Sequence, residues 1–411
     1  MRIAFFVTAF PEASITFVIN QITFLLDRGH DVDIFATRRG KGGVVHADVA
    51  RYRLPDRTCY LPAPPDNLWI RRMGGLGILA RYGWRSPAAY LRAMDPRRFG
   101  KQVSSMALPF RMVPFLPGRS YDVIHCHFGP TGRIAADLCE VGVLKGNLIT
   151  TFHGYGVTAY PRRHGSDVYR RLFDRGDLFT ANSSFTLGKL TELGCPPARI
   201  VRLPVGLNLK DFAFAERRLR SDDPITILTV ARLVEVKGVE YGIRAIAKLA
   251  PTYPRLRYQI VGDGPLRPAL EQLAADLGVA DRCRFLGAMT QEQLRQTYAQ
   301  AHLFMLTGVV GRDGAEEGQG LVLLEAQATG LPVLASRVGG VPDSMLDGES
   351  GVLVEPGHVE ALADRIGWLI EHAEAWPQMG RMGRAFVERG FDIQRLNDRL
   401  IELYERLLRK R

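Results

Sequence analysis

Residues 309–337, VVGRDGAEEGQGLVLLEAQATGLPVLASR, pass from a glycine-rich acidic loop into a short apolar helix and then into a strand. Glu317 belongs to the loop and Glu325 to the helix, where helical spacing puts Glu325 on the same side as Leu321 and Ala328. That side would normally be buried, and a buried carboxylate needs a specific partner because desolvating an unpaired charge is costly. The local pattern leaves open a ligand-binding carboxylate and an ordinary solvated helix glutamate, so the rest of the chain must decide.

Outside this stretch, apolar strand patterns alternate with helical patterns along most of the chain. The first series of strands is RIAFFVT, DVDIFAT, YDVIHCH, NLITTFHG, DLFTANS and RIVRLP. A second series is ITILTVA, LRYQIVG, RCRFL, HLFMLT, LPVLAS and GVLVEP, with helices predicted to begin near Val239, Leu266, Gln291, Gly320, Val338 and His358. Continuous apolar strands separated by helices predict parallel sheets covered on both faces, hence two doubly wound α/β domains in tandem.

A charged segment without a strand or helix repeat, residues 204–224, is the predicted linker. It divides the chain into a first domain of residues 1–205 and a second of residues 206–389, followed by a terminal helix in residues 390–411. A length of 411 residues agrees, because it exceeds what one ordinary core supports.

The bulk composition is typical of a soluble globular protein, with 46% hydrophobic and 24% charged residues. The five cysteines form no C-x-x-C pair, which indicates reduced thiols in a cytosolic protein. No stretch is long and apolar enough to span a membrane, and MRIAFFVTAF is better interpreted as a first buried strand than as a signal peptide.

The net charge of +11 is concentrated in the first half, where residues 1–205 hold 28 Lys/Arg against 15 Asp/Glu. Residues 51–119 contribute thirteen basic and three acidic residues, interleaved with aromatic ones. This composition is typical of a segment that binds an anionic membrane surface, with Arg71, Arg72, Arg97 and Arg98 as candidate contacts. The alternative is a set of ordinary helices whose arginines face water. No nucleic-acid motif accompanies the charge, so we expect no nucleic-acid partner.

Candidate site residues collect at the ends of predicted parallel strands, where open α/β sheets bind ligands. Arg232 and Lys237 follow ITILTVA, and Gly238 opens the next helix. Two cations beside helix-terminal N–H groups predict an anion site, although two exposed basic residues in a loop would look the same.

Other strand ends carry weaker signals. Gly262, Asp263 and Gly264 follow LRYQIVG and permit a tight turn, but they do not form the G-x-G-x-x-G dinucleotide pattern. His127 ends a His-x-His pair with no third metal ligand nearby, and His153 ends another strand facing the expected cleft. Together, the cations, helix N-termini, paired glutamates and histidine suit a phosphorylated sugar ligand.

Several of these segments resemble a known family. ARLVEVKG, IVGDGPLRPALEQL, RFLGAMT and EGQGLVLLEAQATGLPVLASRVGGVPDSMLDGESGVLV are similar to the second domain of family 4 retaining glycosyltransferases. The first 38 residues resemble the subgroup that builds colanic acid and other bacterial exopolysaccharides. The resemblance implies the GT-B architecture, two Rossmann-like domains facing a cleft, with the terminal helix crossing back to the first domain.

The resemblance also implies roles for individual residues. Arg232, Lys237, Gly320 and Leu321 would bind the donor diphosphate, Glu325 the ribose, and Glu317 and His153 would be catalytic beside the transferred sugar. The implied nucleotide surroundings are Gly262, Asp263, Gly264 and Leu286, and the implied acceptor side of the cleft is His127, Gly154 and Tyr155. No metal or other cofactor is implied, because basic residues and a helix terminus would stabilise the departing diphosphate.

Three departures from the family pattern stand out. Gln319 occupies the position of a usual aromatic residue, and Ala231 replaces a common glycine. The first strand is followed by Thr8-Ala9-Phe10-Pro11 in place of the glycine-rich loop of many members, which puts a first-domain contact with the donor phosphate in question.

The leading hypothesis is a retaining hexosyltransferase that uses a UDP- or GDP-linked sugar and a lipid-linked oligosaccharide acceptor in exopolysaccharide synthesis. We expect it in the cytoplasm, on the inner face of the cytoplasmic membrane. One alternative is a sugar-nucleotide epimerase of the same fold, which needs no acceptor. The other is a non-catalytic membrane scaffold, against which the intact set of Arg232, Lys237, Glu317 and Glu325 argues.

Overall fold

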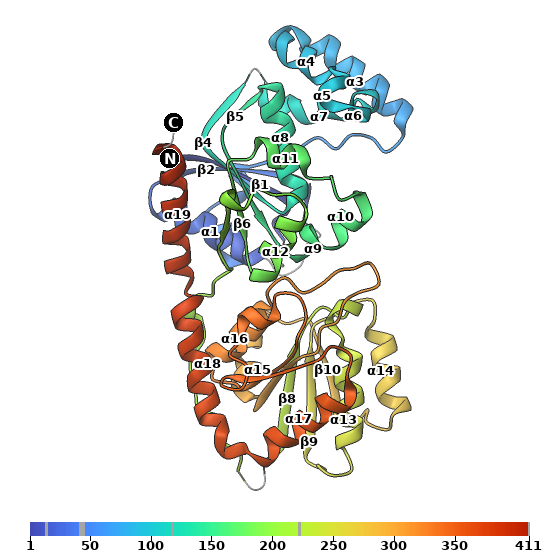
Figure 1. Ribbon diagram of the computed structural model, residues 1–411, viewed down its shortest axis with the longest axis vertical. Helices are drawn as coiled ribbons and strands as arrows, with labels where there is room; N and C mark the ends of the chain where they lie inside the picture. The colour runs from blue at the N-terminus through green and yellow to red at the C-terminus, as the bar shows by residue number, and fades with distance from the viewer. Residues whose placement is uncertain (13–14, 41–45, 117, 221–222, 410–411) are drawn as a thin grey trace.

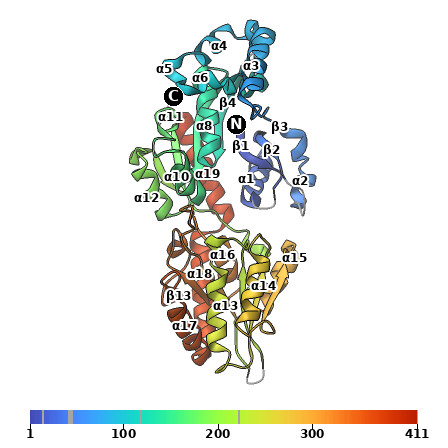
Figure 2. The same cartoon turned by 90° about the vertical axis from the view of Figure 1, so that its right-hand side faces the viewer.

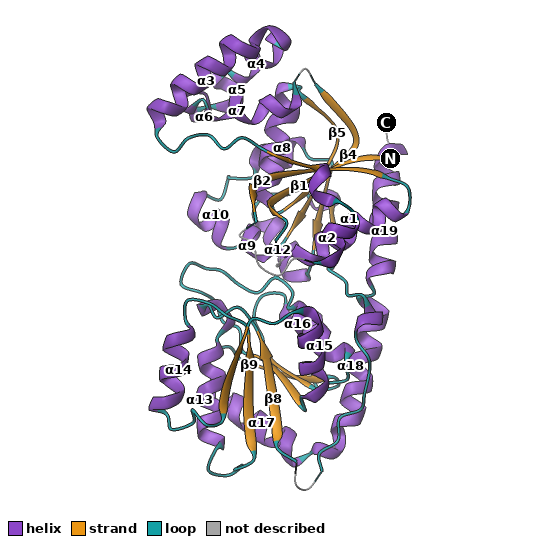
Figure 3. Ribbon diagram, turned by 180° about the vertical axis from the view of Figure 1, so that it is seen from behind, coloured by secondary structure: helices purple, strands orange, loops and turns teal. Residues whose placement is uncertain are grey.

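The computed structural model describes residues 1–411 except 13–14, 41–45, 117, 221–222 and 410–411. The described residues form two α/β domains that follow one another along the long axis of the molecule (Figure 1). Each domain has its own parallel sheet covered by helices on both faces, as the sequence predicts (Figure 3).

The first sheet has seven parallel strands in the order β3-β2-β1-β4-β5-β6-β7. Its strands are β1 (Arg2–Phe10), β2 (Asp31–Arg39), β3 (Thr58–Tyr60), β4 (Arg119–His127), β5 (Leu144–Phe152), β6 (Leu178–Ala181) and β7 (Ile200–Arg202). The helices around it are α1 (Thr16–Asp27), α2 (Ala47–Arg51), α8 (Gly129–Val141), α9 (Gly154–Val157), α10 (Ala159–His164), α11 (Arg170–Arg175) and α12 (Ser184–Glu192).

A helical insertion separates β3 from β4 and projects from the end of the first domain that faces away from the second (Figures 1 and 2). Its helices are α3 (Leu68–Tyr82), α4 (Pro87–Ala93), α5 (Pro96–Phe99), α6 (Lys101–Ser105) and α7 (Ala107–Met112). The short strand β3 just before the insertion is absent from the sequence prediction, because three half-buried residues carry no periodic signal.

The second sheet has six parallel strands in the order β10-β9-β8-β11-β12-β13. The strands are β8 (Ile225–Val230), β9 (Leu256–Val261), β10 (Cys283–Gly287), β11 (Leu303–Leu306), β12 (Val333–Ser336) and β13 (Gly351–Val354). The helices are α13 (Val239–Leu249), α14 (Arg267–Asp276), α15 (Gln291–Gln300), α16 (Leu321–Ala328), α17 (Val359–Glu371) and α18 (Trp376–Gly390).

In each sheet the strand order reverses at one point, between β1 and β4 in the first sheet and between β8 and β11 in the second. Ligands of doubly wound sheets bind beyond the strand ends at such switch points. Residues that follow β1 and β4 and residues that follow β8 and β11 line the same space between the two domains, so both switch points open onto it.

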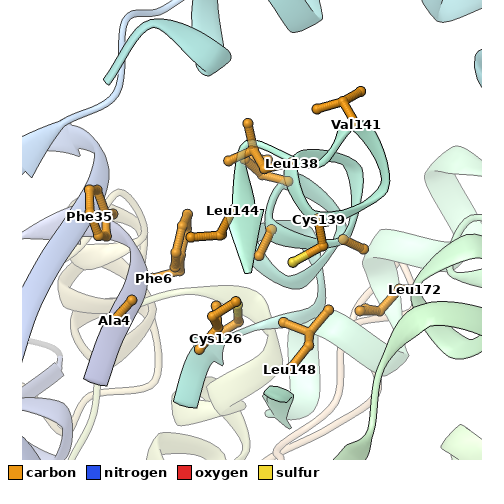
Figure 4. Close-up of a cluster of buried hydrophobic side chains, with 14 of the residues drawn as sticks. Ala4, Phe6, Phe35, Cys126, Leu138, Cys139, Val141, Leu144, Leu148 and Leu172 are labelled. Atoms are coloured by element: carbon orange, nitrogen blue, oxygen red, sulfur yellow. The ribbon is translucent and has the colours of Figure 1, made fainter. Parts of the chain in front are cut away.

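The first-domain core packs the sheet against α8. Phe6 and Phe35 from β1 and β2 stack at 5.1 Å between ring centroids, and Leu138 and Cys139 of α8 close the cluster (Figure 4). All five cysteines are free, and four of them are buried.

The last helix, α19 (Ile393–Arg409), runs back along the first domain (Figure 1). Leu400, Leu403 and Tyr404 are buried in the cluster formed by β1 and α1. Arg28 of the first domain also pairs with Asp398 at 2.5 Å. The end of the chain therefore ties the two domains together.

The prediction of a helix that begins near Val338 is wrong. The structure has only a four-residue 3-10 turn there, Val341–Ser344, and Met345 is extended. Pro342 lacks the N–H that a longer helix would use, and Gly339 and Gly340 are needed for a close backbone contact described below.

None of the described helices is both long and apolar enough to cross a bilayer.

Candidate active site

A cleft of about 920 Å³ lies between the two domains, which is within the range of small-molecule sites. Its first-domain wall is formed by Ile15, Phe17, Phe128, His153, Gly154, Tyr155, Asn182 and Val205. Its second-domain wall is formed by Arg232, residues 234–237, Gly311, Arg312, Asp313 and residues 315–322. The structure thus brings together eight of the predicted site residues: His153, Gly154, Tyr155, Arg232, Lys237, Glu317, Gly320 and Leu321.

Lys237 and Glu317 form an ion pair at the centre of the second-domain wall. Their side chains are only 19% and 17% exposed. Burial alone would raise the pKa of Glu317, but the Lys237 ammonium and the N–H groups of Gly318 and Gln319 outweigh it and lower that pKa. Glu317 is therefore a carboxylate at neutral pH, and a cation lies directly beside it.

The N-terminus of α16 supplies further positive potential to the same wall. Gly320 precedes the helix in the left-handed conformation, with φ of 83°, and no side chain caps the helix. Leu321 and Val322, the first two helical residues, line the cleft. Uncapped N–H groups and the helix dipole favour an anion, and the exposed guanidinium of Arg232 lies in the same wall.

Two glycines outside the cleft hold the Glu317 loop in place. A Cβ atom on Gly339 would lie 2.1 Å from the Glu317 carbonyl oxygen, and one on Gly340 would lie 2.0 Å from the Gly318 carbonyl oxygen. The Gly340 N–H donates to the Glu317 carbonyl at 2.8 Å. Only glycine allows this approach, so the sequence Val338-Gly339-Gly340 is part of the site although it contacts no cavity.

Glu325 lies one helical turn behind the cleft wall and does not line the cleft. The Tyr298 hydroxyl donates to its Oε2 at 2.8 Å. Burial raises the pKa of Glu325 to about 7, against the smaller opposite effect of the Tyr298 hydrogen bond. The carboxylate is thus poised to change charge near neutral pH, and its structural partner is a neutral hydroxyl.

On the opposite wall, His153 ends β5 and is buried except for its cleft edge. Burial lowers the pKa of His153 to about 3, so its imidazole is neutral at neutral pH. Phe17 and Phe128 flank it with ring centroids at 4.9 and 4.7 Å. Phe128 has a φ of 73°, an unusual conformation for a residue with a side chain, at the point where β4 turns into α8.

Two more histidines lie behind His153. His127 is fully buried, with its Nδ1 3.4 Å from Nε2 of His153, and it does not line the cleft. His125 is hydrogen-bonded to the Tyr404 hydroxyl at 2.6 Å and to the Thr151 hydroxyl at 2.7 Å. Among the described residues, no cluster of three or more His, Cys, Asp or Glu side chains could hold a metal ion.

The two walls meet at a close seam. The Gln319 side chain accepts from the Val205 N–H and donates to the Val205 carbonyl, both at 2.9 Å. Beside it, a Cβ atom on Gly154 would lie 2.9 Å from the Gly318 nitrogen, so these two glycines let the domains touch. Sequence reasoning missed this seam, although the departure of Gln319 from the family's aromatic residue was a signal for it.

Comparisons with known proteins place the chain in a family. Residues 16–211 match the family described as Glycosyltransferase Family 4, and residues 211–386 match Glycosyl transferases group 1. WcaL of Salmonella typhimurium strain LT2, named as a colanic acid biosynthesis glycosyltransferase, is 32% identical over 98% of this chain and 100% of its own length. The protein belongs to glycosyltransferase family 4. Another relative, the amylovoran biosynthesis glycosyltransferase AmsK of Erwinia amylovora, is 32% identical over 99% of this chain and 100% of its own.

Solved structures share the fold of this glycosyltransferase. Anabaena Alr3699/HepE in complex with UDP superposes with a TM-score of 0.73 at 18% identity, covering 98% of this chain and 100% of that one. Sucrose-phosphate synthase from Thermosynechococcus elongatus gives a TM-score of 0.72 at 21% identity, with both chains fully covered. These likenesses confirm the predicted GT-B architecture.

The remaining predicted residues lie outside the cleft of the glycosyltransferase. Gly262 and Gly264 support the Arg232 loop, since Cβ atoms there would lie 1.9 Å from the Ala231 carbonyl oxygen and 2.5 Å from that of Leu233. Asp263 also supports this loop, because its carbonyl accepts from the Leu233 N–H at 2.9 Å.

Leu286 is half-buried against the second-domain core. Arg71, Arg72, Arg97 and Arg98 belong to the helical insertion, at the other end of the first domain.

Proposed function

We propose that this glycosyltransferase moves a hexose from a nucleoside-diphosphate sugar to a lipid-linked oligosaccharide during exopolysaccharide synthesis. The observation that supports this most is the meeting, in one cleft, of Lys237, Arg232 and the α16 N-terminus with Glu317 and, opposite, His153. A diphosphate needs the cations and N–H groups, and a sugar needs neutral and acidic hydrogen-bonding partners.

The names of similar proteins support the donor and the pathway. HepE is described in complexes with UDP and with UDP-glucose. A GDP-mannose-dependent mannosyltransferase of Mycolicibacterium smegmatis is 31% identical over 62% of this chain. WcaL and AmsK are named for colanic acid and amylovoran biosynthesis, so we propose a UDP- or GDP-linked donor and an exopolysaccharide precursor as acceptor.

In the proposed reaction, the bond between the sugar anomeric carbon and the diphosphate breaks while the acceptor oxygen bonds the same carbon from the same face. The departing phosphate oxygen takes the acceptor proton, so configuration is retained and no separate base is needed. Arg232, Lys237 and the α16 N–H groups stabilise the charge that develops on the diphosphate, which is why we propose a metal-independent reaction. The donor ribose would extend past the cleft wall to Glu325, a half-buried carboxylate one turn further along α16, which would accept hydrogen bonds from the ribose hydroxyls.

The proposed acceptor carries a lipid, which places the enzyme on the cytoplasmic face of the membrane. The basic insertion of the first domain would then lie against anionic headgroups.

The test is a thermal-shift panel of UDP- and GDP-linked hexoses, followed by product analysis with the donor that binds. A donor present at a hundred times its Kd stabilises the folded protein by about 2.7 kcal/mol. Lys237→Met should abolish the shift, whereas Lys248→Met, at an exposed ion pair of the same domain, should leave it unchanged.

Two results would contradict the proposal. One is the absence of stabilisation by any member of the panel. The other is interconversion of free nucleotide sugars without an acceptor, which would make the protein an epimerase.

A further inference from the structure

The helical insertion of the first domain carries an unusual share of exposed apolar side chains. Seven of the thirteen large hydrophobic residues that are exposed in the described chain lie within residues 68–91. We call them the α3–α4 surface: Leu68, Trp69, Ile70, Met73, Leu76, Trp84 and Leu91. Both tryptophans are 72% exposed and Leu91 is 75% exposed, so large exposed apolar side chains are concentrated in this segment and are not scattered singly over the molecule.

The opposite side of α3 explains why these side chains face outward. Gly75 packs on Met106, the residue before α7, where a Cβ atom would lie 2.7 Å from that of Met106, and a Cβ atom on Gly74 would lie 2.9 Å from the Phe110 ring of α7. At 3.6 residues per turn, Trp69, Met73 and Leu76 project from the side away from these glycines. The helix is therefore anchored by its smallest residues and presents its largest apolar ones to the surroundings.

The segment that carries this surface is strongly basic, with single acids, Asp66 and Asp95, at its two ends. Residues 67–94 contain five arginines and no acidic residue. Arg72 donates to the Ser104 carbonyl and Arg92 to that of Val141, while Arg85 lies over the Tyr82 and Trp84 rings. None of the five arginines forms an ion pair with a carboxylate in the described part of the chain.

We propose that the α3–α4 surface docks on an anionic lipid bilayer by inserting its apolar side chains at the interface. The inference rests on the proposed function, since it identifies the surface that would hold the enzyme beside a lipid-linked acceptor. Tryptophan prefers the membrane–water interface, and arginines without acidic neighbours are attracted to anionic headgroups. A second copy of the chain is the less favourable occupant, because a twofold contact would bring five arginines against five others.

The four arginines that the sequence singled out are not equivalent in this arrangement. Arg98 is paired with both Asp95 and Glu140, so its charge is already compensated. Arg71 is half-buried, and its Nε atom has no hydrogen-bond partner among the described residues. The apolar side chains, together with Arg81 and Arg85, are therefore the decisive contacts.

Docking at this surface leaves the cleft free. Strand β4 begins at Arg119, just after the insertion, and ends at His127 behind the cleft wall. Its nine residues span roughly 26 Å at the rise of a parallel strand. Substitutions on the α3–α4 surface should therefore leave nucleotide binding unchanged.

The test is co-sedimentation of the full chain with vesicles of phosphatidylcholine alone or mixed with phosphatidylglycerol. Wild type should bind the anionic vesicles, and the variant Trp69→Ser, Trp84→Ser, Leu91→Ser should bind them at least about tenfold more weakly. Trp368→Ser is the matched control, because Trp368 is an exposed tryptophan of the second domain. Equal binding by the triple variant and wild type would overturn the proposal.

Tryptophan fluorescence gives an independent readout of insertion. In a Trp368→Phe background the emitters are Trp69, Trp84 and the fully buried Trp376. Brominated lipid chains should quench the exposed pair, whereas sedimentation without quenching would show adsorption without insertion and overturn the proposal. Arg81→Glu with Arg85→Glu should weaken binding more than Arg97→Glu.

Measurements of the oligomeric state and of nucleotide binding separate the remaining outcomes. If wild type is a dimer without lipid and the triple variant a monomer, the surface is an interface between copies and the bilayer proposal is wrong. UDP or GDP binding should be equal in wild type and the triple variant, which also shows that the variant is folded. If wild type binds neither UDP nor GDP, the proposed function is contradicted, whatever the result with vesicles.

Discussion

The two walls of the cleft differ in the charge of the groups they present. The second-domain wall carries Arg232 and the Lys237–Glu317 ion pair, in which Lys237 lowers the pKa of Glu317. The first-domain wall presents His153, whose pKa burial lowers to about 3, between the rings of Phe17 and Phe128. One wall therefore presents charged side chains, and the other presents neutral and aromatic ones.

This division matches the two parts of a sugar nucleotide. The diphosphate carries charge and needs ionised partners, whereas the sugar is neutral and binds through hydrogen bonds and ring faces. In the proposed reaction, the second domain stabilises the leaving group and holds Glu317 beside the sugar, while the first domain, with His153, places the acceptor. The following predictions test that assignment.

The largest effect is expected from Glu317→Gln, which removes the carboxylate of the charged wall. Turnover with the identified donor should fall roughly 100- to 1,000-fold, the size of effect seen when a charge-stabilising group at a reacting centre is removed. The variant should still fold but unfold at a lower temperature, because the Lys237 ammonium, only 19% exposed, loses its carboxylate partner. Glu360→Gln, at the exposed pair with Lys248, is the control, and near-normal turnover of Glu317→Gln would contradict the assigned role.

The buried histidines at and behind the first-domain wall predict that the free energy of unfolding falls in acid. The folded-state pKa values of His125 and His153 are lowered to about 3 and that of His127 is also well below normal, so below pH 6.5 the unfolded state binds more protons. Stability present above pH 6.5 is therefore lost as pH falls, by roughly 2 kcal/mol per histidine between pH 7 and 5.

His127→Phe keeps a ring against Phe5 but removes one of these groups, and urea unfolding at both pH values should show a smaller acid loss. An unchanged loss would mean that His127 is not held neutral.

A smaller effect is expected from His153→Gln. Glutamine keeps one hydrogen-bonding group but loses the ring that packs on Phe17, so turnover should fall about tenfold. The wild-type pH–rate profile between pH 5 and 8 should show no limb from His153. A limb near pH 6.5 that disappears in His153→Gln would show an imidazolium and break the contrast between the walls.

The smallest effect concerns Glu325, whose pKa is raised to about 7. The ionised carboxylate is a stronger acceptor for the ribose hydroxyls than the protonated acid, so affinity for an intact nucleotide sugar should rise with pH through 7. The change should be about fivefold between pH 5.5 and 8, and Glu325→Gln should flatten it. Calorimetric titration at the two pH values measures this, and a pH-independent wild-type affinity would count against the ribose contact.

The sequence by itself determined the local part of this protein. Strand and helix periods predict both sheets, and Gly320 with the apolar run after it predicts α16. The same local patterns place Arg232, Lys237 and Glu317 at the ends of strands or in adjoining loops. Hydrophobic periodicity, turn residues and helix caps act over a few neighbouring residues. The strands, the helices and the residues at their ends can therefore be predicted from the sequence alone.

Only the tertiary structure decided how those residues are partnered and charged. It pairs Lys237 with Glu317, 80 positions away, gives Glu325 the hydroxyl of Tyr298, and uses Gln319 to bind Val205 across the domain seam. It also replaces the helix expected near Val338 with a turn. Desolvation and pairing depend on which distant segments pack together, and no local pattern encodes that packing.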